Sequence, residues 1–382
     1  MEFRFHDDHA FSYEILRAVA YTPYDGADLG EVLATTAVIR AGDWDSWYER
    51  WHALAARTEE TAERAAKAGH RESARSAYLR ASNYYRTAEF YLRDDPAGDP
   101  RVLPVFERGV DCFRRALDSS ALNWRRVRIP YEGVELEGYY LQAGGDEPRP
   151  TLLAHGGFDS TVEEMYFSAG AAALRRGWNC LLFEGPGQGA AVRRHGLRFR
   201  PDWEAVVTPV VDHALTLPGV DPDRIALLGM SLGGYLAPRA AAFEHRLAAC
   251  VAFDGIHDLG GVAQGLAPAA GAQPSSDQRW LLANARWTLG TSDWDELAAV
   301  FAEYDLTGIA PAITCPTLVC DAESDKFFPS SQPRQLHDEL TCEKELISFT
   351  ADEGADEHCH MGALTLFHQR AFDWLDEVVA GR

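Results

Sequence analysis

A serine flanked by glycines lies where a buried strand pattern meets a helical one. Residues 229–233 read Gly-Met-Ser-Leu-Gly; they follow the apolar run IALL and precede the helical stretch YLAPRAAAFEHR. A sharp strand-to-helix turn needs small residues at both ends, and it exposes the serine hydroxyl in a strained conformation. The alternative is a plain glycine-rich loop after a strand. The flanking patterns favour the first interpretation and predict that Ser231 is a nucleophile.

A serine hydroxyl attacks a carbonyl only when a base removes its proton. After a turn of this kind, an acid and then a histidine are expected to follow later strands. The segment TLVCDAESDKFFP carries Asp321 and Asp325. We expect Asp325, directly before KFFP, to orient the base, with Asp321 as the alternative.

The base is expected after the last strand pattern, ELISFT. The following segment, ADEGADEHCHMGA, contains His358 and His360. Because His358 follows the turn region at 354–355 and helix signals resume at Met361, we predict that His358 is the base. His360 is expected to cap the next helix or to be exposed. Adjacent His-Cys-His residues lack the usual spacing of metal ligands, so neither a metal nor another cofactor is expected.

An oxyanion formed by attack of Ser231 needs two backbone N–H donors. One is expected from Leu232, the residue after the nucleophile. The other is expected from the loop after the strand TLLA, where Gly157 is the first choice and Phe158 the alternative. His155 of the same loop is interpreted as structural.

The pattern around these residues is that of an α/β protein. Short apolar runs alternate with helical segments after residue 122, which indicates βαβ units in a mostly parallel, eight-stranded sheet. The expected strands are a hairpin around Glu132–Gly133, followed by 151–157, 179–185, 224–231, 247–255, 317–324 and 345–350.

Two further segments lie outside this pattern. Residues 1–121 have helical periodicity, with Trp44, Trp47 and Trp51 on one face, and predict an N-terminal helical cap module beside a catalytic domain at 122–382. Between about 256 and 312 there is no strand signal, and we expect a helical lid insertion there. The aromatic stripes are expected to be packing residues.

Composition narrows the class of protein. Acidic residues number 58 against 36 basic ones, for a formal charge of -22. Such a chain repels nucleic acid and anionic lipid, so the expected partner is a small-molecule substrate. The seven scattered cysteines, the polar N-terminus and the lack of a long apolar run predict a cytoplasmic protein without disulfides.

Five motifs together carry a family resemblance. They are HGGFDS at 155–160, FEGPGQG at 183–189, GMSLGG at 229–234, ESDKFFP at 323–329 and GADEHCHMGA at 354–363. With them and its helical N-terminal module, the chain resembles the dihydroxypseudooxynicotine hydrolase group within the fermentation–respiration switch protein family of α/β-hydrolases. The resemblance implies the α/β-hydrolase fold and the triad Ser231, Asp325 and His358, and it makes a homodimer plausible. It also implies an acidic residue after the Gly-Gly of the oxyanion loop, where this chain has Asp159 instead of glutamate. Asp159 is therefore a candidate catalytic acid, with a helix N-cap as the alternative.

The resemblance implies a reaction class as well. The family includes enzymes that cleave carbon–carbon bonds beside a ketone, so we expect hydrolysis of a β-dicarbonyl, polyketide-like or alkaloid-derived small molecule. The same triad would serve an ester or thioester hydrolase. It would also serve a lyase that eliminates a carboxylate such as acetate. A non-catalytic regulatory binding protein on the same scaffold is the remaining alternative.

Overall fold

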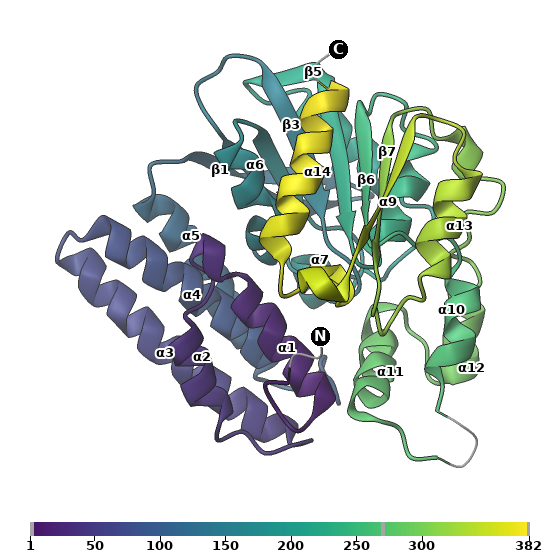
Figure 1. The fold of residues 1–382 in the computed structure, drawn as a ribbon. Coiled ribbons are helices and arrows are strands. Elements are labelled where there is room, and N and C mark those ends of the chain that lie inside the picture. The colour runs from purple at the N-terminus through teal and green to yellow at the C-terminus, as the bar shows by residue number, and fades with distance from the viewer. Residues whose placement is uncertain (1–3, 269–271, 380–382) are drawn as a thin grey trace. The chain divides into compact units, whose positions relative to one another are not determined.

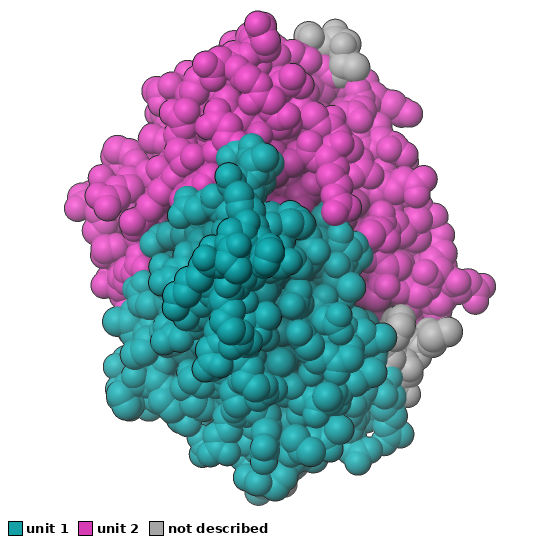
Figure 2. Space-filling view, turned by 90° about the vertical axis from the view of Figure 1, so that its left-hand side faces the viewer, with its two compact units in different colours: residues 1–122, 268–287 teal, residues 123–267, 288–382 magenta. Residues whose placement is uncertain are grey.

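The computed structural model describes residues 4–268 and 272–379 and divides into two compact units. Unit 1 comprises residues 1–122 and 268–287, and unit 2 comprises residues 123–267 and 288–382 (Figure 2). The segment expected as an insertion at 256–312 is therefore shared between the two units. Its role as a lid stays a prediction.

Unit 1 is helical. Helix α3 is capped by Asp43, whose carboxylate accepts the N–H of Ser46 at 2.8 Å. The segment DDPAGDP at 94–100 separates α4 from α5, as its breaker residues predict. The helices are α1 (His9–Ala20), α2 (Leu29–Thr36), α3 (Trp44–Lys67), α4 (Arg71–Glu89), α5 (Val102–Ser119) and, after the chain has passed through unit 2, α11 (Ser276–Thr288).

Aromatic side chains fill the interior of unit 1. Trp47 and Trp51 of α3 are completely buried. The indole of Trp47 also donates to the carbonyl of Thr87 at 2.7 Å. Trp280 of α11 stacks on Phe90, with ring centroids 4.5 Å apart. The prediction that the tryptophans of α3 are packing residues is thus confirmed.

The centre of unit 2 is one eight-stranded sheet, in the order β1-β2-β4-β3-β5-β6-β7-β8 (Figure 1). The hairpin β1–β2 turns at Glu132–Gly133, where Gly133 has a φ of +85°, and β2 also pairs antiparallel with β4. All other neighbouring strands are parallel. The strands are β1 (Asn123–Tyr131), β2 (Val134–Gln142), β3 (Arg149–His155), β4 (Asn179–Phe183), β5 (Val220–Met230), β6 (Ala249–Phe253), β7 (Thr317–Ala322) and β8 (Lys344–Phe349).

Helices cover the sheet on both faces. Every residue of β4, β6 and β7 is buried, which explains their continuous apolar runs. In Figure 1, α14 crosses in front of the sheet and α9 lies behind it. The helical segments of unit 2 are η2 (Tyr166–Gly170), α6 (Ala171–Arg175), α7 (Gly189–His195), α8 (Glu204–Ala214), α9 (Gly233–Ala241), α10 (Leu259–Leu266), α12 (Trp294–Phe301), α13 (Ser331–Glu339) and α14 (Leu364–Val379).

The order of strands and helices confirms the predicted α/β-hydrolase fold. Parallel strands connected through helices place their carboxyl ends at one edge of the sheet, where side chains from distant parts of the chain meet. None of the seven cysteines, all of which lie among the described residues, forms a disulfide. Among the described residues, no helix combines the length and hydropathy that crossing a membrane requires.

Candidate active site

Ser231 lies at the sharp turn between β5 and α9. Its φ is +61°, a left-handed conformation that is rare for residues other than glycine and is typical of strained functional turns. Its N–H donates to the carbonyl of Phe253 in the neighbouring strand at 2.9 Å, which holds the turn in place. Gly229 permits this geometry, because a Cβ atom there would lie 2.1 Å from the carbonyl oxygen of Gly233.

The structure brings Ser231, His358 and Asp325 together. The Nε2 atom of His358 lies 2.9 Å from Oγ of Ser231, and its Nδ1 atom lies 2.7 Å from Oδ2 of Asp325. Because an ionised carboxylate can only accept, Nδ1 carries the proton and Nε2 is left to accept from the serine hydroxyl. Three residues far apart in the sequence thus form one hydrogen-bonded chain.

The carboxylate of Asp325 is fixed by its own loop after β7. Its Oδ1 atom accepts the N–H groups of Phe327 and Phe328 at 2.7 and 2.9 Å, which leaves Oδ2 directed at His358. Asp321, the alternative in the sequence, is buried elsewhere, and its Oδ2 accepts the hydroxyl of Ser348 at 3.0 Å. The geometry therefore selects Asp325 over Asp321.

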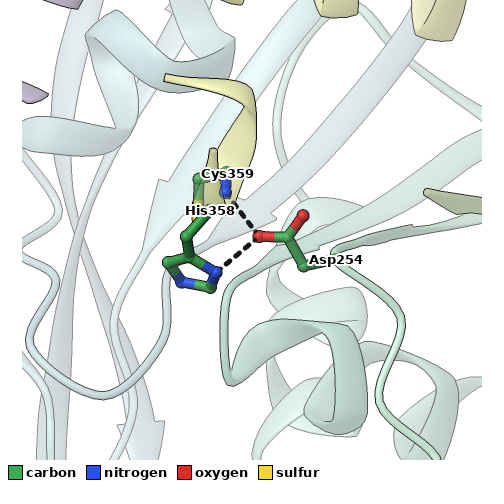
Figure 3. Close-up of side chains that lie close together, drawn as sticks. All are labelled: Asp254, His358 and Cys359. Carbon is green, nitrogen blue, oxygen red and sulfur yellow. Dashed lines mark hydrogen bonds and ion pairs between the residues drawn. The ribbon is translucent and has the colours of Figure 1, made fainter. Parts of the chain in front are cut away.

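A fourth residue of this cluster, Asp254, is absent from the sequence-based expectations. It follows β6 directly, and its side chain is directed at His358 and Cys359 (Figure 3). Its Oδ2 atom lies 3.0 Å from Nδ1 of His358 and accepts the N–H of Cys359 at 2.7 Å. The signal that could have revealed it is the segment Phe-Asp-Gly at the end of a predicted strand beside the nucleophile strand.

Burial and charge act against each other in this cluster. Burial alone would lower the pKa of His358, but the carboxylates of Asp325 and Asp254 outweigh it and hold the pKa well above its usual range. Burial likewise raises the pKa of Asp254, and the charge and hydrogen bond of His358 more than compensate, lowering it to about 2. The cluster therefore favours ionised acids beside a readily protonated imidazole.

His360 is neither exposed nor a helix cap, and that expectation was wrong. Its side chain is completely buried and stacks on Phe349, with centroids 3.9 Å apart. Its Nδ1 atom lies 3.3 Å from the carbonyl of Ala355, and burial lowers its pKa. The neutral imidazole of His360 packs in apolar surroundings. The polar residues next to it in the sequence do not indicate this burial.

The loop expected to supply the oxyanion hole lies against the nucleophile turn. A Cβ atom on Gly157 would lie 2.6 Å from the backbone nitrogen of Leu232 and 2.9 Å from Cβ of Ser231, so glycine is needed at this position. The N–H of Gly157 donates to the hydroxyl of Ser160 at 3.1 Å. The N–H of Gly157 is thus engaged in this structure, and the N–H of Phe158 is the alternative donor that the sequence offers.

Gln188, from the GPGQG segment between β4 and α7, holds this loop from behind. Its side chain is buried, and its Nε2 atom donates to the carbonyls of Gly156 and Gly157 at 2.6 and 3.1 Å. Its Oε1 atom accepts the N–H of Gly185 at 2.9 Å. Since C=O and N–H point in opposite directions across a trans peptide, fixing the Gly157 carbonyl also fixes the N–H of Phe158.

Asp159 lies half-buried in the turn after Gly157 and Phe158. The helical segment that follows is entered at Thr161, whose hydroxyl accepts the N–H of Glu164 at 3.4 Å. The role of Asp159 as a catalytic acid stays a prediction. His155 is buried, with Nδ1 2.9 Å from the carbonyl of Gly156, and burial lowers its pKa to about 4. These contacts are consistent with the structural role expected for His155.

Potential metal ligands do meet at one point among the described residues. One ligand atom from each of Asp254, His358 and Cys359 lies within 4.8 Å of the others. However, Nδ1 of His358 carries the proton shared with the carboxylates, and burial raises the pKa of the Cys359 thiol far above its usual value. Both atoms would have to lose a proton before they could bind an ion. We therefore do not assign a metal to this cluster.

Comparisons with known proteins identify the family of the chain. A model of the esterase FrsA-like family matches residues 11–267, and a model of the prolyl oligopeptidase family matches residues 202–382. Hydrolase acrC of Aspergillus aculeatus is 36% identical, with 98% of each chain covered. The 20-hydroxy-prefusarin hydrolase FUS2 of Gibberella moniliformis is 34% identical over 97% of this chain and 96% of its own.

Among solved structures, the 2,6-dihydroxy-pseudo-oxynicotine hydrolase superposes with a TM-score of 0.79 at 25% identity, covering 95% of this chain and 97% of its own. The likeness to these hydrolases spans nearly the whole chain, helical unit included. The chain belongs to the FrsA-like esterase family of α/β-hydrolases.

Proposed function

We propose that the protein is a serine-dependent hydrolase that cleaves a carbon–carbon bond beside a ketone in a small molecule. The observation that carries the proposal is the chain of hydrogen bonds from Ser231 through His358 to Asp325, at 2.9 and 2.7 Å. The choice of a carbon–carbon bond rests on the family resemblance and on the likeness to the 2,6-dihydroxy-pseudo-oxynicotine hydrolase.

In the first step, Nε2 of His358 takes the proton of the Ser231 hydroxyl while Oγ attacks the ketone carbon. The carbonyl electron pair moves to oxygen, and the resulting oxyanion is held by the N–H groups of Leu232 and Phe158. Asp325 keeps the proton of His358 on Nδ1 and stabilises the imidazolium that forms. In this mechanism the raised pKa of His358 makes it a strong base.

In the second step, the oxyanion collapses and the carbon–carbon bond breaks. The electron pair of that bond passes to the leaving carbon, where a second carbonyl stabilises it as an enolate. The imidazolium of His358 protonates that carbon, either directly or through Asp159, which would give up its own proton and take the proton of the imidazolium in exchange; either way His358 is neutral again. Water, activated by His358, then hydrolyses the acyl-Ser231 ester and releases a carboxylic acid.

Active-site labelling and product analysis test this proposal. A fluorophosphonate probe should label Ser231, and Ser231→Ala and His358→Ala should each abolish labelling and turnover. Reaction in ¹⁸O-water should place one labelled oxygen in the carboxylic acid product. Turnover retained by Ser231→Ala would contradict a serine nucleophile. A product without solvent oxygen would indicate elimination of a carboxylate, the lyase alternative.

Ester hydrolysis is the second candidate, and the description of the matching family as esterases favours it. An ester releases an alkoxide instead of a carbanion, so a carbon acid is not required. Asp159→Asn separates the two reactions. If Asp159 protonates the leaving carbon, the variant should lose ketone cleavage and keep hydrolysis of an activated aryl ester. Equal effects on both would remove Asp159 from the mechanism.

A further inference from the structure

We propose that Asp254 is a second positioning acid for His358, so that two carboxylates, each from the segment after a different strand, hold the imidazole. The inference rests on the proposed role of His358 as the base that activates Ser231. Asp325 is held by the loop after β7, whereas Asp254 directly follows β6. Their Oδ2 atoms lie 2.7 and 3.0 Å from the same Nδ1 atom.

The segment Phe253–Asp254 joins the nucleophile turn to the histidine turn. The carbonyl of Phe253 accepts the N–H of Ser231 at 2.9 Å. The next residue, Asp254, contacts the imidazole of His358 and accepts the N–H of Cys359. Two adjacent residues at the end of one strand thus fix the nucleophile on one side and the base on the other.

Asp254 occupies a costly position, which argues against a purely space-filling role. Its φ is +69°, and its side chain is 3% exposed. Its Oδ1 atom has no hydrogen-bond partner among the described residues and lies 3.6 Å from Nε2 of His360. A buried carboxylate is stable only beside compensating donors or positive charge. The imidazole of His358 supplies that charge when it takes the proton of Ser231.

Other titratable groups lie on the segments around His358. Besides Asp254 and Asp325, they include Cys359 and His360 on the same turn as His358, Glu357 directly before it, and Lys326 and Asp356, whose charges act on Glu357. Burial keeps the thiol protonated and His360 neutral. The rings of Phe327 and Phe328 lie edge-on to the imidazole, with centroids 5.0 and 5.3 Å away. Both ion-pair contacts described for Nδ1 of His358 are with carboxylates.

A double-mutant cycle of Asp254→Asn and Asp325→Asn tests whether the two acids act on the imidazole together. Asparagine tolerates the left-handed backbone, and its oxygen can still accept the N–H of Cys359. If either acid can orient the imidazole, loss of Asp254 should reduce kcat/KM at least about tenfold more in the Asp325→Asn background than in the wild type. Fold losses that simply multiply would overturn the proposal.

The pH profile separates positioning from a structural role. An anion close to an imidazole raises the imidazole pKa by about 1–3 units. Asp254→Asn should therefore move the acid limb of kcat/KM to lower pH and reduce the plateau. The matched control is Asp321→Asn. Asp321 is another buried aspartate, in β7, and its carboxylate accepts the hydroxyl of Ser348, so this variant should leave the acid limb in place. An unshifted limb in Asp254→Asn would contradict the inference.

A measurement without turnover keeps this test independent of the proposed reaction. The pKa of His358 can be read by NMR of labelled histidine in the Ser231→Ala background, with and without Asp254→Asn. A lowered value supports the inference, and an unchanged value overturns it. If His358→Ala retains turnover, the proposed function fails instead. If His358→Ala is inactive and Asp254→Asn leaves the pKa of His358 unchanged, only the role of Asp254 is overturned.

Discussion

Replacement of Gln188 by methionine should disable the oxyanion loop without touching the triad. Methionine has nearly the same length as glutamine but cannot donate to the carbonyls of Gly156 and Gly157. Those bonds, at 2.6 and 3.1 Å, fix the two peptide planes whose N–H groups belong to Gly157 and Phe158. Without them, the Phe158 N–H loses its fixed direction, while Ser231 and His358 keep their contact.

The size of the effect follows from the number of bonds removed. The Gly157 carbonyl loses its donor, whereas the Gly156 carbonyl keeps its contact with Nδ1 of His155. The unsatisfied Gly157 carbonyl costs about 1–3 kcal/mol unless the loop rotates to find another partner. Loss of one aligned oxyanion donor reduces kcat by about 10²–10³-fold. We expect kcat to fall about 10²-fold with little change in KM, because the oxyanion exists only after attack.

The assay compares turnover with binding of a transition-state mimic. A phosphonate or trifluoromethyl ketone that forms an oxyanion should lose affinity by the same factor as kcat/KM, whereas a ground-state product should bind as before. The control is Gln142→Met: Gln142 is also buried, and its Nε2 donates to the carbonyl of Pro218 at 3.2 Å. Both variants should lose some stability. Equal kcat values in the two variants would refute the reasoning.

Three other changes have defined outcomes. Burial raises the pKa of Glu184 to about 8, so between about pH 4.5 and 8 this carboxyl is protonated in the folded state but not in the unfolded chain. The free energy of unfolding therefore falls as pH rises through that window. Glu184→Gln should flatten this fall in thermal melts, and a pH dependence parallel to that of the wild type would contradict the prediction. Trp280→Ala removes the stack on Phe90 and the hydrogen bond to the Phe90 carbonyl. It should lower the free energy of unfolding of unit 1 by about 1–3 kcal/mol in urea. An unchanged urea midpoint would show that α11 contributes little to the stability of unit 1. Dialysis against EDTA should leave turnover unchanged, since His358 acts through a proton on Nδ1; activity that returns only with a divalent ion would overturn that assignment.

Local patterns in the sequence were sufficient for the element order and for the choice of Ser231, His358 and Asp325, which the structure brings within hydrogen-bonding distance of one another. The strands and helices follow from runs and periodicities within a few residues, and α3, expected at 43–68, extends over Trp44–Lys67. Ser231 is marked by its turn, because only small neighbours allow a strand to reverse into a helix so sharply. His358 and Asp325 follow the last two parallel strands, whose carboxyl ends must lie near Ser231.

Other contacts depended on distances that no local pattern contains. Asp254 reaches His358 because β6 lies between β5 and β7 and because its own backbone is left-handed. Gln188 reaches the oxyanion loop from the turn after a different strand. The hydroxyl of Ser160 accepts the N–H of Gly157, a contact that the sequence does not reveal. His360, one residue beyond Cys359, turns into the core instead of toward solvent.

The sequence by itself determined which residues can carry the chemistry, because nucleophile, base and acid each need a particular side chain beside a particular kind of turn. Tertiary structure decided which further groups support them, namely a second carboxylate at the histidine and a glutamine behind the loop. The physical reason is that hydrogen bonds act over about 3 Å. Only the packing of the strands and their turns brings groups from distant parts of the chain within that distance.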